Sequence, residues 1–247
     1  MDGLEPHIRL GKGLNTRYAL LAGDPARIER VAVYLEDVEE LAYNREYRSI
    51  RGRYKDASVL AVSTGIGGAS IGIAVEELHN IGVQALIRIG SCGALQPGIG
   101  LGDLILASGA VRDDGASRAY VPEGFPAVAD PALLQMCIRA AEEQRLHYHV
   151  GLVRSHDSFY TDQETEICRF WSTRGILGAD METAALFTIA ALRGMKAASI
   201  LNNVVGYEAD TAEGIDQYAG GDDRMAMGEQ AEIRTALEAF ASLEEGR

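Results

Sequence analysis

The sequence has 247 residues, a net charge of −13, and 47% hydrophobic residues. This apolar fraction supports a substantial core, and the length suits one large α/β domain or two small ones. A strongly acidic surface repels nucleic acid and acidic lipid, which argues against a role in binding either.

The three cysteines, Cys92, Cys137 and Cys168, form an odd and sparse set without CxxC spacing. This pattern indicates neither a disulfide framework nor a zinc site. Residues 1–10 contain no apolar run of signal-peptide length, and no stretch approaches the roughly 20 apolar residues of a membrane helix. We therefore expect a soluble cytoplasmic protein with no membrane contact.

Predicted strands and helices alternate along the chain. The expected strands are Tyr18–Ala22, Ser58–Ser63, Gln84–Ile89, Asp103–Val111, Val150–Arg154 and Ala197–Leu201, with a short one at Ile176–Leu177. The expected helices are 25–35, Ala69–Ile81, Pro131–Gln144, Gln163–Thr173, Met181–Arg193 and Asp223–Leu243. This order favours a mixed or parallel sheet covered by helices in one domain. Glycine-rich turns are expected at Gly23, Gly65 and Gly90, beyond the carboxyl ends of strands, where such sheets bind ligands.

The first motif suited to chemistry is Gly23-Asp24-Pro25-Ala26-Arg27. Asp24 is typical of a helix N-cap, and Pro25 is typical of the first helical position. A helix N-terminus offers free N–H groups to an anion, and Arg27 would add a cation. A plain strand-to-helix turn with a solvated Arg27 is the simpler interpretation of this segment taken alone.

The second motif, Arg88-Ile89-Gly90-Ser91, belongs to an apolar strand. A charged Arg88 there is costly unless it is paired. A bound phosphate would be a suitable partner, since arginine presents a planar fork to oxygen anions, and an internal carboxylate would be another. Cys92 follows directly but has no evident histidine partner, so we expect no nucleophilic thiol.

Two further segments carry side chains suited to a nucleoside. In Asp180-Met181-Glu182, a carboxylate at a helix start could accept two hydrogen bonds from sugar hydroxyls, or could simply cap the helix. Phe159 could stack on a flat ring, and Gln163 could pair with a base edge. The simpler interpretation of each residue taken alone is core packing for the first and a surface position for the second.

The order and spacing of several segments are more specific than any one of them. The set comprises Gly23-Asp24-Pro25-x-Arg27, Arg45-Glu46, Ser63-Thr64-Gly65-Ile66-Gly67-Gly68, Arg88-Ile89-Gly90-Ser91, Asp157-Ser158-Phe159-Tyr160 and Asp180-Met181-Glu182. Over residues 6–205 the chain resembles the hexameric nucleoside phosphorylase family, and within it the uridine phosphorylases. The resemblance implies a single α/β domain over residues 1–247, with a central mixed, partly barrel-like sheet flanked by helices. It also implies a pentosyltransferase that uses phosphate to split a nucleoside, with uridine expected, into base and ribose 1-phosphate.

The resemblance assigns a phosphate site to five residues. They are Gly23, Arg27, Arg45, Arg88 and Ser91, with Arg45 reaching across a dimer interface. Phosphate held beside the anomeric carbon would stabilise the positive charge that the sugar gains as the glycosidic bond breaks. Arg27, Arg88 and Glu182 are therefore the expected catalytic residues, and no metal or organic cofactor is required.

The resemblance also implies contacts to the sugar, the base and a cation. The ribose contacts are His7 from a neighbouring subunit, Met181 and Glu182. The base contacts are Phe159, Gln163, Thr165, Val204 and Val205. A structural K⁺ between subunits would lie at Glu46, Ile66 and Ser70. The implied assembly is a hexamer built as a trimer of dimers.

Departures from the family pattern concern specificity. Uridine phosphorylases usually carry Gln-x-Arg at the base site, but the third position here is Thr165. We therefore hypothesise that Arg169, one helical turn past Thr165, or His156 supplies the missing charge. Asp180 stands where the family commonly has glutamate, and the shorter carboxylate would weaken a sugar or base contact. Purine-type members place an aspartate after the late strand, and residues 202–206 contain none, which favours a pyrimidine or a 6-oxopurine.

Three alternatives to a uridine phosphorylase remain open at this point. A purine nucleoside phosphorylase acting on 6-oxopurine nucleosides fits the missing arginine at Thr165. A nucleoside hydrolase would not need Arg27, Arg45 and Arg88 together. A catalytically silent nucleoside-binding protein is supported only by the departures at the base site. The acidic, glycine-rich residues 207–223 could form a flap over the base.

Overall fold

The computed structural model describes residues 3–209, 214, 216, 218 and 223–246. Its strands are β1 (Tyr18–Ala22), β2 (Glu36–Asn44), β3 (Tyr47–Tyr54), β4 (Ala57–Ser63), β5 (Ala85–Ala94), β6 (Leu104–Asp113), β7 (Ala127–Val128), β8 (Tyr148–His156), β9 (Gly178–Asp180) and β10 (Lys196–Val205). Its helices are α1 (Pro25–Ala32), α2 (Gly68–Asn80), α3 (Gly115–Tyr120), α4 (Pro131–Glu143), α5 (Glu164–Ser172), α6 (Thr183–Leu192) and α8 (Asp223–Glu245).

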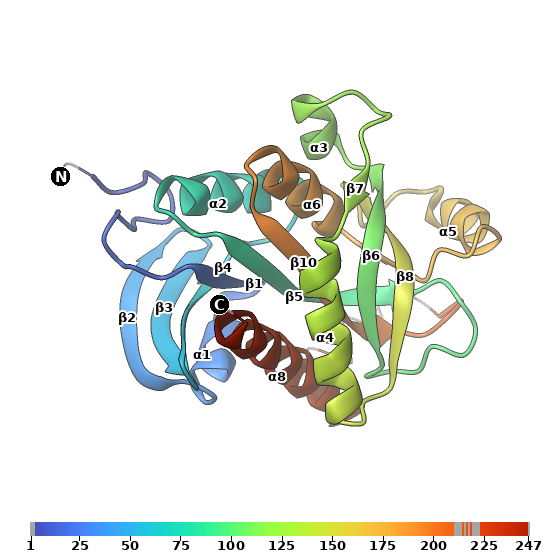
Figure 1. Ribbon diagram of the computed structural model, residues 1–247. Helices are drawn as coiled ribbons and strands as arrows, with labels where there is room; N and C mark the ends of the chain where they lie inside the picture. The colour runs from blue at the N-terminus through green and yellow to red at the C-terminus, as the bar shows by residue number, and fades with distance from the viewer. Residues whose placement is uncertain (1–2, 210–213, 215, 217, 219–222, 247) are drawn as a thin grey trace.

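The strands form one mixed sheet that is partly closed into a barrel. The order along the sheet is β10-β6-β8-β9-β5-β1-β4-β3-β2, and β10 also pairs with β5. This extra pairing closes β5, β9, β8, β6 and β10 into a ring, while β1, β4, β3 and β2 extend the sheet beyond β5 (Figure 1). The predicted mixed, partly barrel-like sheet flanked by helices is confirmed.

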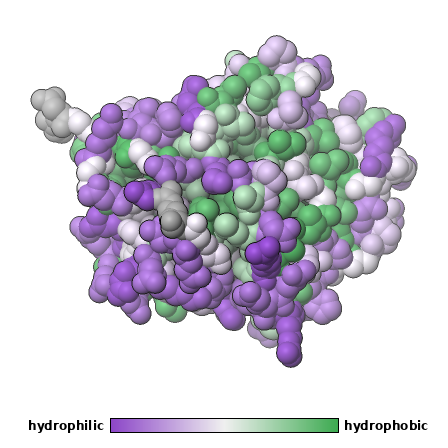
Figure 2. Space-filling model, viewed as in Figure 1, coloured by the Kyte–Doolittle hydropathy of each residue, from purple (hydrophilic) through white to green (hydrophobic). Residues whose placement is uncertain are grey.

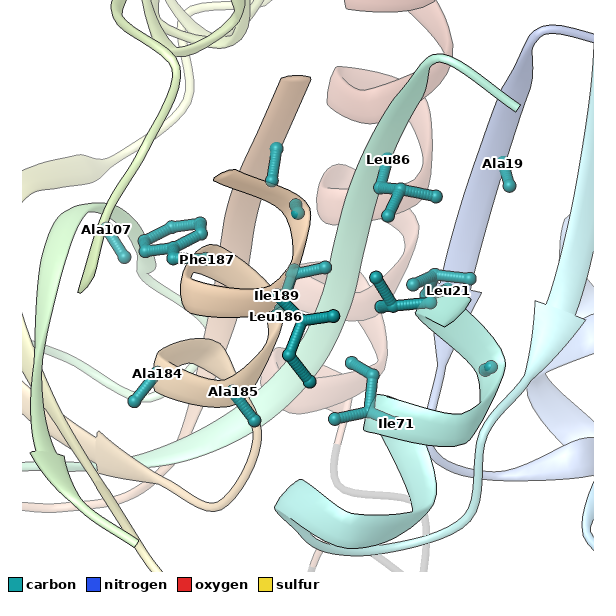
Figure 3. Packing of buried hydrophobic residues seen from close by; sticks show 14 of the residues in the cluster. Ala19, Leu21, Ile71, Leu86, Ala107, Ala184, Ala185, Leu186, Phe187 and Ile189 are labelled. Atoms are coloured by element: carbon teal, nitrogen blue, oxygen red, sulfur yellow. The ribbon is translucent and has the colours of Figure 1, made fainter. Parts of the chain in front are cut away.

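Helices cover both faces of the sheet, so its central strands are buried on both sides. In β1, Ala19 and Leu21 belong to one hydrophobic cluster with α2 and α6, whereas Leu20 belongs to a second cluster with α1, α4 and α8. Figure 1 shows α2 and α6 on one side of these strands and α8 on the other. Figure 3 shows Leu86 of β5 among side chains of α2 and α6.

Two long strands, β2 and β3, were missed by the sequence prediction. Residues of β2 read Glu-Asp-Val-Glu-Glu-Leu-Ala-Tyr-Asn, and most of them are exposed. A strand that faces solvent shows no apolar alternation, because its conformation comes from pairing with a neighbour. That neighbour is β3, which pairs antiparallel with β2 and connects it to β4. The short elements α3 and β7 were also missed.

The predicted turn at Gly90 is wrong. Strand β5 continues through Gly90 to Ala94, and it pairs with β10 along this length and with β9 at Gly93 and Ala94. The short strand expected at Ile176–Leu177 begins later, as β9 at Gly178. Barrel closure explains the extension of β5, because residues beyond Ile89, where the pairing with β1 ends, find partners in β10 and then in β9.

The surface combines a strongly hydrophilic part with an apolar one. Figure 2 shows hydrophilic side chains over β2 and β3, and hydrophobic ones gathered toward β6 and β8. Val128, Val150 and Leu152 are exposed large hydrophobic residues of β7 and β8. Among the described residues, no helix has the length and apolar character needed to cross a membrane.

Candidate active site

A cavity of about 1200 Å³ opens where β1, β4 and β10 end and where the second half of β5 runs. Ten of the residues assigned to phosphate, ribose, base or cation contacts line it: Gly23, Arg27, Ile66, Arg88, Ser91, Phe159, Thr165, Met181, Glu182 and Val205. The expected position of the ligand site at the carboxyl ends of strands therefore agrees with the structure. The volume is sufficient for a nucleoside together with an anion.

Strand β1 and helix α1 place Arg27 at one end of the cavity. Asp24 is the N-cap, as predicted, and its carboxylate accepts a hydrogen bond from the Ala26 backbone N–H at 2.8 Å. One turn later, Arg27 is only 4% exposed, so the interpretation as a solvated arginine is wrong. Its Nε donates to Glu229 at 2.9 Å and its Nη2 donates to Tyr218 at 2.5 Å.

Strand β5 places Arg88 beside the same space, at 3% exposure. Its Nε donates to Asp180 at 3.2 Å, and its Nη2 donates to Glu182 at 2.5 Å. Its buried Nη1 has no hydrogen-bond partner among the described residues. Gly90 makes room for this guanidinium, because a Cβ at Gly90 would lie 2.6 Å from Cζ of Arg88.

The start of α6 provides two carboxylates with different roles. Glu182 accepts from the Gly67 backbone N–H at 2.5 Å, in addition to Arg88, and it lines the cavity. Asp180 is surrounded by donors: it accepts from Ser155 at 2.5 Å and from the Thr183 backbone N–H at 3.0 Å. Asp180 therefore caps α6 and holds Arg88.

Burial and charge act in opposite directions on Glu182. Burial raises the pKa of its carboxyl, and the positive charge of Arg88 works against that rise. The Gly67 N–H also favours the ionised form. An ionised Glu182 is an acceptor for two hydroxyl groups, which is the contact expected for a ribose.

Helix α8 contributes two carboxylates that the sequence analysis did not single out. Glu229 bonds Arg27, Arg30 and Tyr218, and Glu232 accepts from the Gly90 backbone N–H at 3.0 Å. Glu229 and Glu232 are three positions apart in the sequence, and both lie among the apolar residues of α8. Charged residues on the apolar side of an amphipathic helix are a signal that could have identified them.

The far end of the cavity carries the residues suited to a base. His156, Phe159, Thr165 and Arg169 line it, as does Val205. The Nδ1 of His156 lies 2.9 Å from the Ser158 carbonyl oxygen, which only accepts. Nδ1 therefore carries a proton, and in a neutral ring Nε2 is a hydrogen-bond acceptor. His156 and Arg169, the two side chains proposed to supply the missing positive charge, therefore both line the cavity.

Two predicted base contacts lie off the cavity wall. Gln163 precedes α5 and is exposed, and it is outside the set that lines the cavity. Val204 is fully buried and packs with Val205 and Met225. Of residues 207–223, Tyr207 and Tyr218 line the cavity, whereas the predicted flap includes residues 210–213, 215, 217 and 219–222, which lie outside the described part.

The residues expected to act across a subunit interface lie apart from the cavity of their own chain. His7 Nδ1 bonds Glu77 of α2 at 2.6 Å, and Arg45 is exposed in the turn between β2 and β3. At the candidate cation position, Ser70 donates to Glu46 at 2.9 Å. The Thr64 carbonyl oxygen is a second acceptor within reach of the same hydroxyl, whose single proton serves these two acceptors.

Cys92 lines the cavity but is not set up as a nucleophile. Burial raises the pKa of its thiol well above the ordinary value, and the carboxylates of Asp180 and Glu232 act in the same direction. A thiol kept neutral is a poor nucleophile, because the thiolate is the reactive form. The structure gives no support to covalent catalysis through Cys92.

A family model, that of the phosphorylase superfamily, matches residues 17–240. This match runs from β1 to α8 and includes Arg27, Arg88 and Glu182. The chain belongs to the phosphorylase superfamily. The family predicted from the order of motifs is therefore confirmed.

The proteins to which this chain is similar include phosphorylases of different nucleosides. A uridine phosphorylase from Thermococcus kodakarensis is 39% identical over 211 residues, which are 81% of this chain and 76% of the relative. A guanosine phosphorylase from Halorubrum lacusprofundi is 34% identical and is matched over 97% of this chain and 99% of its own. The crystal structure of a uridine phosphorylase from Vibrio fischeri is 46% identical, covers 98% of both chains and superimposes with a TM-score of 0.92. These matches confirm a nucleoside phosphorylase fold and an enzyme of the pentosyltransferase class.

Proposed function

We propose that the protein cleaves uridine with inorganic phosphate, releasing uracil and ribose 1-phosphate. One observation carries the anion site: Arg88 is buried at the cavity with its Nη1 unpaired among the described residues, directly beside Glu182. A buried unpaired guanidinium nitrogen is costly, and a phosphate oxygen would satisfy it. The similarity to uridine phosphorylases supports the choice of nucleoside.

The proposed chemistry follows from these positions. Arg27, Arg88 and Ser91 hold phosphate near the anomeric carbon, with Gly23 leaving room for it and Arg45 of a neighbouring subunit completing the site. Met181 contacts the ribose and Glu182 accepts its hydroxyl hydrogens, with His7 of a neighbour near the 5′-hydroxyl. As the bond from C1′ to the base nitrogen breaks, its electron pair leaves with the base, and a phosphate oxygen forms the new bond to C1′.

The alternative is a purine nucleoside phosphorylase acting on 6-oxopurine nucleosides. Thr165 supplies no positive charge at the base end, and a guanosine phosphorylase is among the relatives that match almost the whole chain. Turnover of a panel of uridine, thymidine, inosine and guanosine with phosphate separates the two. Uracil release in excess of the purines supports the main proposal, whereas preferential release of hypoxanthine or guanine supports the alternative.

The base end itself is tested by His156→Ala and Arg169→Ala. If either side chain replaces the missing arginine, we expect its variant to lose at least about tenfold in kcat/KM for uridine, the size of one lost hydrogen bond to a base edge. Phosphate KM serves as the control, since neither residue is assigned to the phosphate. Undiminished uridine turnover in both variants would refute the hypothesis.

The assembly and cellular setting complete the proposal. A hexamer built as a trimer of dimers would bring His7 and Arg45, which do not line their own cavity, to the cavity of a neighbour. Glu46, Ile66 and Ser70 would then lie near the dimer interface and could share a monovalent cation, on which no step of the chemistry depends. A cytoplasmic enzyme of pyrimidine salvage is the setting that fits uridine as substrate.

A further inference from the structure

The arginines of the phosphate site are outnumbered by buried carboxylates. The cluster around Arg27 and Arg88 comprises three guanidinium groups and four carboxylates, those of Arg27, Arg30, Arg88, Asp180, Glu182, Glu229 and Glu232. With every group ionised, the cluster carries one net negative charge. A phosphate dianion entering such a cluster would add two more, which a poorly solvated site does not tolerate.

Glu232 is the carboxylate of this cluster that is least stabilised by its partners. It is 0% exposed, and its Oε2 accepts a single hydrogen bond, from the Gly90 backbone N–H at 3.0 Å. Its Oε1 lies 3.5 Å from Arg27 Nη1, beyond a good hydrogen bond, and is unpaired among the described residues. Glu229, by contrast, bonds both Arg27 and Arg30.

The charged and titratable groups that act on Glu232 are Arg27 of α1, Arg88 and Cys92 of β5, Glu229 of α8 and Tyr218. Burial raises the pKa of Glu232 to about 8, since it outweighs the attraction of Arg27. Glu232 is therefore protonated near neutral pH and ionised in alkaline solution.

We propose that Glu232 is a positioning residue for Arg27, and that phosphate binds only when Oε1 of Glu232 carries a proton. Near neutral pH Oε1 already carries this proton, whereas in alkaline solution it is taken up from solvent as phosphate binds and is released when the phosphate ester leaves. The proton removes one negative charge that would repel the anion and compete with it for Nη1 of Arg27. This inference rests on the proposed phosphate-dependent function.

The test compares phosphate KM at pH 7.5 and 9.0, with the nucleoside saturating and phosphate expressed as its dianion. When only the protonated enzyme binds, the apparent KM scales inversely with the protonated fraction, which predicts a rise of about eightfold in the wild type. In Glu232→Gln the amide keeps the acceptor for Gly90 and imitates the protonated acid, so phosphate KM should change less than about twofold. Glu238→Gln is the matched control on α8, because Glu238 bonds Tyr54 and Lys55 instead.

An equal rise in the wild type and in Glu232→Gln would overturn the proposal. Calorimetry of phosphate binding to the wild-type enzyme at pH 9.0, in two buffers of different ionisation enthalpy, tests it without any variant. Uptake of nearly one proton per phosphate is expected, and binding without proton uptake would overturn this inference alone. Absence of phosphate binding at every pH would overturn the proposed function and this inference together.

Discussion

At the residue scale, Arg88 shows how a strand can carry a charged side chain in a buried position. Two carboxylates and a glycine shape its surroundings: Asp180 and Glu182 accept from it, and Gly90 leaves space for its guanidinium. The two carboxylates hold the side chain in one orientation, and the unpaired Nη1 stays available for an anion. The same residue therefore serves both the fold and the proposed chemistry.

Replacing Arg88 should separate these two roles. Arg88→Ala leaves Asp180 and Glu182 buried without their cation, which costs about 3–5 kcal/mol of stability. Arg88→Lys keeps the charge but loses the planar fork, so we expect phosphate KM to rise about tenfold or more with a smaller loss of stability. Initial rates over phosphate concentration and thermal unfolding of both variants provide the measurement. An unchanged phosphate KM in Arg88→Lys would place the anion elsewhere.

At the scale of elements, the burial of a strand decides whether its position could be predicted from the sequence. Strands β1 and β4 are buried on both faces and read as apolar runs, so their positions were predicted closely. Strand β2 is exposed and polar, and its conformation depends on β3, which no local pattern discloses. For the site, the motif order identified Arg27, Arg88 and Glu182. It could not identify Glu229 and Glu232, because their pairing depends on how α8 packs beneath residues far away in the chain.

The packing of α8 is tested at Gly228, where the helix packs against Asn202 of β10. A Cβ there would lie 2.7 Å from Cγ of Asn202 and 2.8 Å from the backbone oxygen of Gly102. Backbone cannot yield easily, so Gly228→Ala should lower the free energy of unfolding by about 1–3 kcal/mol. Gln230→Ala, on the exposed side of α8, should change it by less than about 0.5 kcal/mol. Chemical denaturation measures both, and equal stabilities would show that α8 does not pack this closely.

At the scale of the whole molecule, two residues expected to contact the substrates lie outside the cavity lining of their own chain. His7 bonds Glu77, and Arg45 is exposed in a turn, so neither lines the cavity of its own subunit. The exposed side chains of Val128, Val150 and Leu152 add an apolar surface of the kind that subunits bury (Figure 2). Both observations favour an active oligomer.

Complementation between two impaired variants tests whether subunits share sites. Arg45→Ala keeps an intact cavity, and Glu182→Gln keeps an intact Arg45, so each should be impaired alone. Co-expression should produce mixed oligomers in which an intact cavity meets an intact Arg45, with activity above the sum of the two variants. Activity equal to that sum, in oligomers shown to be mixed, would mean that Arg45 acts within its own chain or not at all.

The most direct measurement concerns the role of phosphate itself. The enzyme is incubated with uridine in the presence and absence of inorganic phosphate, and the products are followed by phosphorus NMR and by uracil absorbance. We predict uracil and ribose 1-phosphate in equal amounts with phosphate, and no cleavage without it. Release of uracil and free ribose in the absence of phosphate would contradict the assignment of Arg27 and Arg88 to a phosphate site.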